Sequence, residues 1–276
     1  ICLSDWSSDV CSSDLKKKAV EETKATAKVT EASVPAINGA VDAWGMEELN
    51  AGDIIMPKLL LMQGLSKLVT AGEANQGEIA NSLTKEVLGG ITNIKNKTCT
   101  DIEVVCFKAF KTWLEFEKRE GEWVYMKQYP MDASNVDLAQ EETVNGIEIR
   151  RDRCLNYYVL LPKEIEAGSA LPYVVSFRRT SMQAGKKIAS ATTRWKALGA
   201  ANPICHKTFK LTVIQKTKDD KNYWAFDVNE GAPVNAEAQA ECKKWFTALQ
   251  KMSVKIDDSD LKETDPVEAG SGPAEY

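Results

Sequence analysis

The alternation of apolar and polar residues predicts a chain built mainly from β-strands. The clearest strand covers residues 101–118 (DIEVVCFKAFKTWLEFEK), where polar residues interrupt Val, Phe and Trp at about every second position. Glu120 and Gly121 predict a turn after it, so REGEWVYMKQYP should return as a second strand. The segment GEIANSLTKEVLGG has Gly at both ends and alternation between them, which predicts a β-hairpin.

The remaining segments follow the same pattern. Residues 54–62 are expected to be extended or a short helix, 131–145 a surface loop or short helix, 146–162 a strand pair or one long bent strand, and 171–180 a buried strand. Residues 207–228 predict a hairpin that turns at Asp219 and Asp220.

Two segments show helical spacing instead. Residues 181–199 predict a helix that ends at Gly199. Its expected apolar face consists of Met182, Ile188 or Ala189, Trp195 and Leu198. Residues 235–252 predict a C-terminal amphipathic helix. Its expected apolar face consists of Ala238, Cys242, Trp245, Phe246 and Leu249.

These elements favour a mainly β fold with added helices (α+β), and an OB-like or Greek-key small barrel is the expected architecture. Residues 43–254 are expected to form a single β-rich domain. Residues 16–42, rich in Lys, Glu, Ala and Thr, are expected to be a flexible lead-in, and residues 255–276 a disordered acidic tail.

Residues 1–15 stand apart from this pattern. Asp5 to Leu15 (DWSSDVCSSDL) match one reading frame of a common sequencing adapter, so the segment is expected to be artefactual rather than a natural Ser/Asp-rich leader. We therefore exclude it from fold reasoning.

Charge separates along the chain. The net charge is −5, which would argue against a nucleic-acid binder. However, residues 171–226 hold eleven Lys/Arg and two Asp, a net charge of +9, whereas residues 257–276 hold seven Asp/Glu and one Lys, a net charge of −6. Such asymmetry indicates a basic surface and an acidic tail.

No motif indicates an enzyme. At residues 184–190 (AGKKIAS), Lys187 stands where a P-loop requires Ser or Thr, and Thr180 stands where it requires Gly. His206 is the only histidine, and beyond residue 15 the five cysteines form no C-x-x-C pair, so neither a metal site nor a cofactor is expected. No apolar run approaches the ~20 residues of a membrane span, so no membrane partner is expected.

The basic segment interleaves cations with aromatic residues. Single-stranded nucleic acid requires this combination, because cations neutralise phosphates and aromatic rings stack on unpaired bases. The candidate contacts are Arg178, Arg179, Lys186, Lys187, Arg194, Trp195, Lys207, Lys210, Lys216, Tyr223 and Trp224. The alternative is that the aromatic residues belong to the core and the lysines to a solvated face.

The acidic tail is expected to compete with nucleic acid for the basic surface, and to offer a docking peptide to a polymerase or helicase. Its candidate partner contacts are Asp257, Asp258, Asp260 and Tyr276. The alternative is an ordinary solvated end.

Three segments carry a resemblance to a known group. GDIIMPKLLLMQGLSKLVTAGEANQGEIANSLTKEVLGG, FKTWLEF and LPYVVSFRRTSMQAGKKIASATTRW, within residues 50–200, resemble tailed-phage single-stranded DNA-binding proteins that assist replication and recombination. The resemblance implies an OB-like fold and DNA binding, but it does not identify individual contact residues.

The sequence therefore predicts a non-enzymatic, sequence-nonspecific single-stranded DNA-binding protein of phage replication or recombination, located in the cytoplasm of the infected host. A homo-oligomer is compatible with this function. The leading alternative is a virion structural or assembly protein, which would not need a cationic aromatic surface. The third class is an enzyme subunit or a nuclease-associated protein, which should show carboxylates clustered in a pocket.

Overall fold

The computed structural model describes residues 55–64, 66–93, 98–218, 221–251 and 255–262. The chain divides into two units, residues 1–48 and residues 49–276, and the first lies wholly outside the described residues. The expectations for residues 1–15 and for the lead-in at 16–42 therefore concern residues outside this description.

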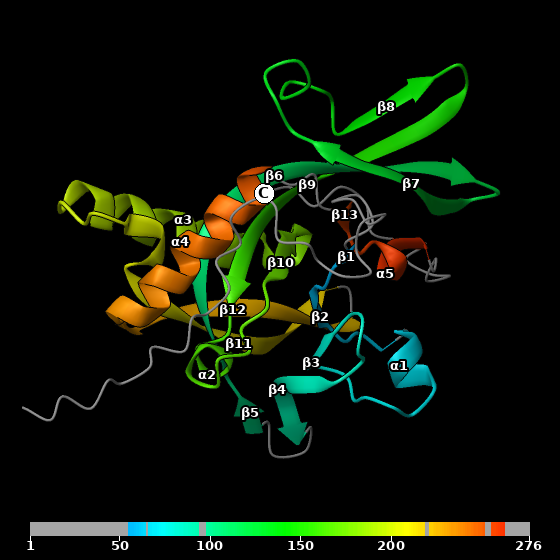
Figure 1. The fold of residues 1–276 in the computed structure, drawn as a ribbon. Helices are drawn as coiled ribbons and strands as arrows, with labels where there is room; N and C mark the ends of the chain where they lie inside the picture. Colours follow the sequence, from blue (N-terminus) through cyan, green and yellow to red (C-terminus); the bar gives the residue numbers. More distant parts are fainter. Residues whose placement is uncertain (1–54, 65, 94–97, 219–220, 252–254, 263–276) are drawn as a thin grey trace, which may run out of the picture. The chain divides into compact units, whose positions relative to one another are not determined.

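A seven-stranded sheet forms the centre of the second unit (Figure 1). Its main strand order is β10-β9-β6-β11-β12, while β7 pairs with β6 and β8 pairs with β9. The strands are β6 (Ile102–Arg119), β7 (Glu122–Pro130), β8 (Glu141–Val144), β9 (Ile147–Leu160), β10 (Tyr173–Arg178), β11 (Lys207–Lys218) and β12 (Lys221–Pro233). Every pairing in this sheet is antiparallel. The fold is therefore mainly β with added helices, as predicted.

The expected barrel is not found among the described residues. No pairing joins β10 to β12, so the seven-stranded sheet stays open there. The OB-like architecture is thus unconfirmed. Alternation predicts which segments are strands, but it does not determine which strands pair with each other.

Two smaller sheets complete the strand content. The first has the order β2-β3-β4-β5 and is antiparallel throughout. Its strands are β2 (Leu59–Leu61), β3 (Glu78–Asn81), β4 (Val87–Asn93) and β5 (Thr98–Thr100). The second joins β1 (Ile55–Met56) in parallel with β13 (Lys255–Ile256).

Glycine is required where β3 and β4 approach each other, at the hairpin predicted for residues 77–90. Gly90 has a φ of +97°, and a Cβ atom there would lie 2.3 Å from the carbonyl oxygen of Gly77. Only glycine combines this backbone conformation with so close an approach.

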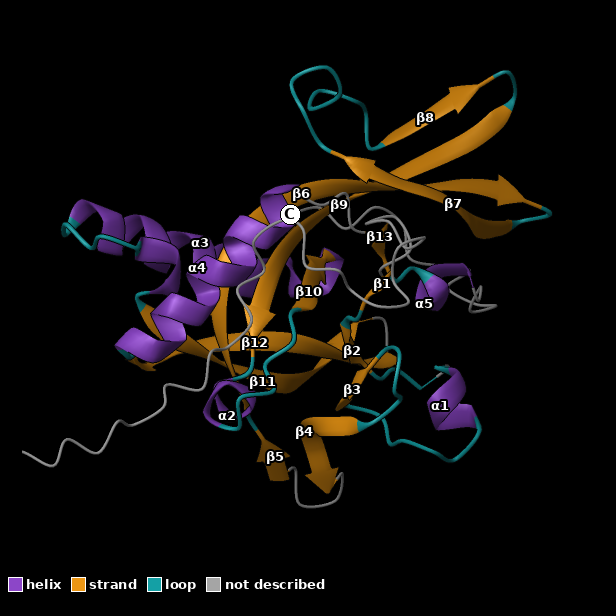
Figure 2. Cartoon of the chain, in the orientation of Figure 1, coloured by secondary structure: helices purple, strands orange, loops and turns teal. Residues whose placement is uncertain are grey.

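The strands β6 and β9 are long enough to serve two regions. Near one end they pair with β11 and β10, and farther along they pair with β7 and β8. We call this second region, residues 112–153, the arm (Figures 1 and 2). The loop expected at residues 131–145 contains one short strand, β8, which its acidic composition had hidden.

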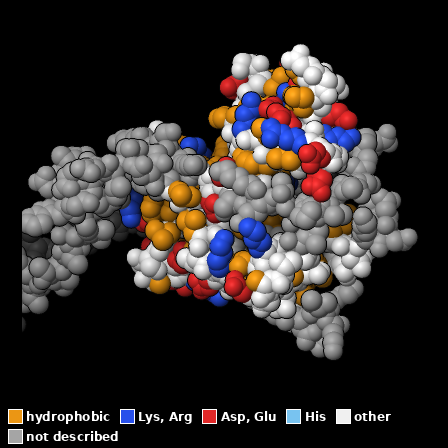
Figure 3. All heavy atoms as spheres, turned by 90° about the vertical axis from the view of Figure 1, so that its right-hand side faces the viewer, with side chains coloured by type: hydrophobic (Ala, Val, Ile, Leu, Met, Phe, Trp, Pro, Cys, Tyr) orange, Lys and Arg blue, Asp and Glu red, His pale blue; other side chains and the backbone are white. Residues whose placement is uncertain are grey.

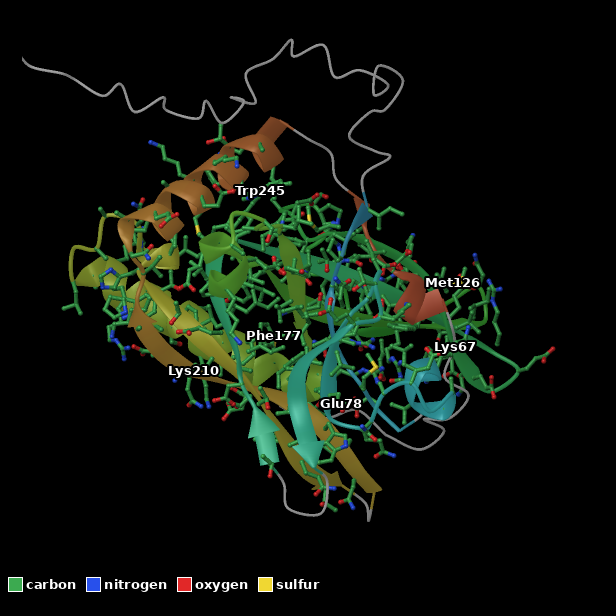
Figure 4. The ribbon with its side chains drawn as sticks, turned by 60° about the horizontal axis from the view of Figure 1, so that its bottom comes forward. Lys67, Glu78, Met126, Phe177, Lys210 and Trp245 are labelled. Carbon is green, nitrogen blue, oxygen red and sulfur yellow. The ribbon has the colours of Figure 1, made fainter. Side chains whose placement is uncertain are left out.

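Alternating side chains of the sheet supply two cores on opposite faces. Val104 and Cys106 belong to a core that is covered by helix α3 (Met182–Ala197), whereas Val105 and Phe107 belong to a core covered by α4 (Ala236–Lys251) and α2 (Pro162–Glu166). Figure 4 shows Phe177 in the interior and Trp245 on α4. The helices predicted at 181–199 and 235–252 are thus present, together with the short helices α1 (Lys67–Thr70) and α5 (Ser259–Lys262) and the 3-10 turns η2 (Arg179–Ser181) and η3 (Pro203–Cys205).

Two residues of the expected apolar helix faces are solvent-exposed. Leu198 is 78% exposed because it is the C-cap of α3, where the helical repeat that placed it on the apolar face has ended. Phe246 on α4 is 37% exposed, whereas its neighbour Trp245 packs against the core.

The first part of the expected acidic tail is structured, which corrects the prediction of disorder from residue 255. β13 pairs with β1, and α5 follows it. Lys58 is 4% exposed and its Nζ lies 2.8 Å from Oδ1 of Asp260. The apolar side chain of Leu261 is buried against the arm. The strand pairing, a partly buried ion pair and an apolar contact therefore help to hold a segment whose composition alone suggested a solvated end.

Candidate nucleic-acid interface

An open groove lies between α3 and strand β12. It has a volume of about 510 Å³ and includes the side chains of Gln183, Lys186, Lys187, Ser190 and Arg194 from α3 and of Asn229 and Glu230 from β12. We call it the α3 groove. Its three cations come from one helix face because residues three and four positions apart lie on the same side of a helix. Three predicted contact residues, Lys186, Lys187 and Arg194, are thus brought together.

The opposite wall of the α3 groove is acidic. The Nζ atom of Lys187 donates to Oδ1 of Asp227 at 2.5 Å, and Arg194 forms an ion pair with Glu230. The Nζ atom of Lys207 lies 3.6 Å from Oε2 of the same glutamate. All of these pairs are substantially exposed, so solvent weakens them and a competing anion could exchange with the carboxylates.

The other predicted cations of β11 lie apart from these. Lys210 is exposed and pairs across the sheet with Asn229 (Figure 4). Lys216 is half-buried, and its Nζ donates to the carbonyl oxygen of Thr180 at 3.2 Å. Thr180 belongs to η2, directly before α3, so Lys216 is held at the N-terminal end of that helix.

Two of the three predicted stacking residues are buried, which corrects the prediction. Trp195 is 3% exposed and Trp224 is 5% exposed, and both belong to the core beneath α3. The ring centroid of Trp195 lies 5.4 Å from that of Phe209. Neither indole presents a face to a base, so the core alternative holds for both. Tyr223 is half-buried and remains the one accessible aromatic residue of the three.

A second group of cations lies where the arm meets β10. Arg150 and Asp152 are on the same face of β9 as Cys154, whose cross-strand partner on β10 is Arg178. The Nε atom of Arg179 donates to Oδ2 of Asp152 at 2.7 Å. We call Arg150, Arg178 and Arg179 the arginine cluster. Asp152 lies between Arg150 and Arg179, and Glu141 is the cross-strand partner of Arg150.

Arg150 is the most enclosed member of the arginine cluster. Its guanidinium carbon lies 4.6 Å from the ring centroid of Trp123 and 5.1 Å from that of Phe116. Burial, followed by the positive charges of Arg179 and Arg178, lowers the pKa of Arg150 to about 10, although the carboxylates of Asp152 and Glu141 oppose this shift. Its Nε atom is buried and has no hydrogen-bond partner. Arg150 therefore holds a buried charged donor without an acceptor.

The opposite face of the arm holds an ion-pair network. Glu115 accepts from Nε of Arg151 at 2.8 Å and lies 3.1 Å from Nζ of Lys127, while Arg151 also pairs with Glu142. Burial alone would raise the pKa of Glu115, but the hydrogen bonds from Lys127 and Arg151 outweigh it and hold the pKa below its ordinary value. Figure 3 shows the side of the molecule on which basic, acidic and apolar side chains of the arm lie next to one another.

The predicted partner contacts of the tail lie against the body. Asp260 pairs with Lys58, and Asp258 accepts from the hydroxyl of Tyr125 at 3.3 Å. Asp257 is buried, and its backbone N–H donates to the carbonyl oxygen of Met56 at 3.1 Å. Tyr276 lies outside the described residues. Asp257, Asp258 and Asp260 thus make contacts within the chain.

Several residues of these surfaces were missed in the sequence. Asp227 and Glu230 face α3 only because β12 runs beside that helix, and no local signal indicated this. Arg150 had a usable signal, since Arg150 and Asp152 alternate in a predicted strand and therefore share one face.

Across the residues that the structure describes, no helix is long and apolar enough to cross a membrane. The same residues contain no group of three or more His, Cys, Asp or Glu side chains placed to hold a metal ion.

These observations define a mainly β protein with an open cationic groove beside one helix and an arginine cluster at the base of an arm. A family model of Pam3 phage gp34-like proteins matches residues 24–262, so the chain belongs to that family and is a bacteriophage protein. Comparison with curated proteins and with solved structures finds no match. The phage origin that the sequence predicted is confirmed, whereas DNA binding stays a prediction.

Proposed function

We propose that this phage protein binds single-stranded DNA without sequence preference, through the α3 groove, during phage DNA replication or recombination in the cytoplasm of the host. The observation that supports the proposal most is the alignment of Lys186, Lys187 and Arg194 along one wall of an open groove. Cations in such a row follow a phosphate backbone, and each phosphate that they neutralise releases counterions.

The acidic wall gives this proposal a specific mechanism. Lys187 and Arg194 are held by Asp227 and Glu230 in the free protein. A strand would displace these two carboxylates, so binding is an exchange of partners rather than the filling of an empty basic groove. The burial of Trp195 and Trp224 leaves few rings for base stacking, so backbone contacts should dominate and salt dependence should be strong.

If DNA has to displace the carboxylates, then removing their charge should raise the affinity of the protein for DNA. Asp227→Asn with Glu230→Gln should increase affinity for a single-stranded oligonucleotide and steepen its salt dependence. Lys186→Gln with Lys187→Gln and Arg194→Gln should reduce the slope of log affinity against log salt by about 2, at ~0.7 per lost phosphate contact. Fluorescence anisotropy with single-stranded and duplex oligonucleotides, at several salt concentrations, measures both effects.

A matched control uses exposed charges outside the groove. Lys163 lies on α2 and Lys243 lies on α4, and both helices cover the other face of the sheet. Lys163→Gln with Lys243→Gln should leave the slope unchanged. Equal responses of the groove and control variants, or no wild-type binding at low salt, would refute the proposal.

The second candidate is a virion structural or assembly protein. The ion-pair network and exposed apolar residues of the arm favour it, because an arm with mixed side chains suits contact with another protein. Val144 is 42% exposed and its cross-strand partner Ile147 is 44% exposed. Assembly through the arm predicts concentration-dependent association, measurable by analytical ultracentrifugation, that Val144→Ser with Ile147→Ser weakens.

A further inference from the structure

The arginine cluster lies at the N-terminal end of the helix that forms the α3 groove. Arg179 opens η2, η2 leads directly into α3, and Lys216 is bound to Thr180 between them. Along the 16 residues of α3, which span about 24 Å at ~1.5 Å per residue, the cations of the groove lie on the exposed side. Positive charge thus continues beyond the N-terminal end of the groove.

Two members of the arginine cluster, Arg150 and Arg178, keep side-chain donors without hydrogen-bond acceptors among the described residues. Asp152 is the carboxylate that pairs with Arg179, and it lies 3.8 Å from Nε of Arg150, beyond hydrogen-bond distance. The side chain of Arg150 is 14% exposed, and its buried Nε has no hydrogen-bond partner. Among the described residues, no hydrogen bond or ion pair involves the side chain of Arg178, which is half-buried.

Glu141, the cross-strand partner of Arg150, adds negative charge here, but among the described residues it forms no hydrogen bond or ion pair with that arginine. Two acidic residues of the C-terminal segment are engaged elsewhere. Asp260 forms its ion pair with Lys58, and Asp258 accepts from Tyr125. Two of the three arginines therefore keep donors that these carboxylates do not satisfy. A buried charged donor without an acceptor is costly, so an arriving anion would gain more here than at exposed lysines.

We propose that the arginine cluster is a second phosphate-binding site, in which Arg178 and Arg150 bind a backbone phosphate of the single strand that occupies the α3 groove. Phosphate fits because its oxygens accept several hydrogen bonds from the planar guanidinium groups. Trp123 and Phe116 hold Arg150 in a fixed orientation and thereby position it for the anion. The site rests on the proposed function, since it extends the path of the same strand.

The decisive variant is Arg178→Gln, because it removes a half-buried cation without breaking an ion pair among the described residues. For single-stranded DNA long enough to span both sites, the slope of log affinity against log salt should fall by about 0.7. Arg150→Lys keeps the charge but loses the planar group, and it should weaken binding of the same strand. Lys243→Gln is the charge-matched control and should leave affinity and slope unchanged.

NMR signals of the arginine N–H groups can show whether the site binds a phosphate of the DNA backbone or free inorganic phosphate. In NMR spectra of the wild-type protein, the Nε–H signal of Arg150 should shift when the long oligonucleotide is added, and should shift less with inorganic phosphate at the same phosphate concentration. A shift with inorganic phosphate alone would mean that the site takes a free phosphate, and the proposed strand path would be wrong. Unchanged slope for Arg178→Gln with normal wild-type DNA binding would overturn this inference alone, whereas absence of wild-type binding would overturn the proposed function itself.

Discussion

Replacement of Trp195 by alanine tests whether the aromatic residues of the basic segment stack on DNA bases or belong to the core. The indole is 3% exposed, and its ring centroid lies 5.4 Å from that of Phe209 and 5.5 Å from that of His206. Removal of so large a buried side chain leaves a cavity between α3 and the sheet. If Trp195 is a core residue, the substitution acts on folding and not on the DNA surface.

The magnitude follows from burial. Truncation of a buried Trp to Ala costs about 3–5 kcal/mol, because the transfer free energy is lost and the cavity collapses only in part. Domains are stable by about 5–15 kcal/mol, so the variant should remain folded in water but unfold at a clearly lower denaturant concentration. A residue that only stacks on a base would instead contribute ~1–3 kcal/mol to binding and little to folding.

The assay combines urea denaturation, followed by far-UV circular dichroism, with oligonucleotide binding in buffer. Trp195→Ala should lose about 3–5 kcal/mol of stability, while the folded protein keeps its affinity for single-stranded DNA. Tyr223→Ala, at a half-buried position, provides the comparison for an accessible ring. The reasoning would be refuted by a Trp195→Ala protein whose stability stays within about 0.5 kcal/mol of wild type while its DNA affinity falls.

Three further predictions concern stability. Glu115→Gln should lower the free energy of unfolding by about 1.5–3 kcal/mol at neutral pH. Because the pKa of Glu115 is lowered in the folded protein, this stabilisation is present above the ordinary carboxyl pKa and should disappear as pH falls through the folded pKa. A stability difference between variant and wild type that persists in acid would contradict this. Gly90→Ala should cost more than ~1 kcal/mol in denaturant unfolding, because φ is +97° and the new Cβ would collide with the carbonyl oxygen of Gly77; unchanged stability would show that the strand can shift. Lys58→Met should cost about 3 kcal/mol by leaving Asp260 unpaired, and adding Asp260→Leu should restore part of the loss; additive losses would argue against a coupled pair.

The sequence predicted individual strands well, because alternation is a local property. The strand at 101–118, the turn at Glu120 and Gly121 and the hairpin at 77–90 are all present. Pairing between strands that are distant in the sequence is not a local property, so the alternation of residues gave no support to the expected barrel. Strand β6 pairs with β11 at residues 102–104, with β9 at residues 105–117 and with β7 at residues 112–119, and nothing in its own sequence indicates these partners.

The cations of the candidate site could be predicted from the sequence, but the carboxylates that pair with them could not. Lys186, Lys187 and Arg194 share a helix face by spacing alone. Their carboxylate partners, Asp227 and Glu230, come from a strand that lies beside α3 only in the folded protein. The burial of the tryptophans was also hidden, because a core strand with solvated lysines and a stacking surface with phosphate contacts show the same interleaving of residue types.

The parallel pair of β1 with β13 has a consequence for the order in which the protein can fold as it is synthesised. Ile55 is matched with Lys255, and Lys58 with Asp260, so each contact joins positions about 200 residues apart. The strand pair cannot form until residues 255 and 256 have been added to the chain, and the ion pair cannot form until residue 260 has been added. Until then the amine of Lys58 has no Asp260 carboxylate, and the arm has no Leu261 to cover its apolar side. Closure of this region therefore has to follow synthesis of residues 255–261, and a chain that stops short of residue 255 would lack the residues that cover this side of the arm.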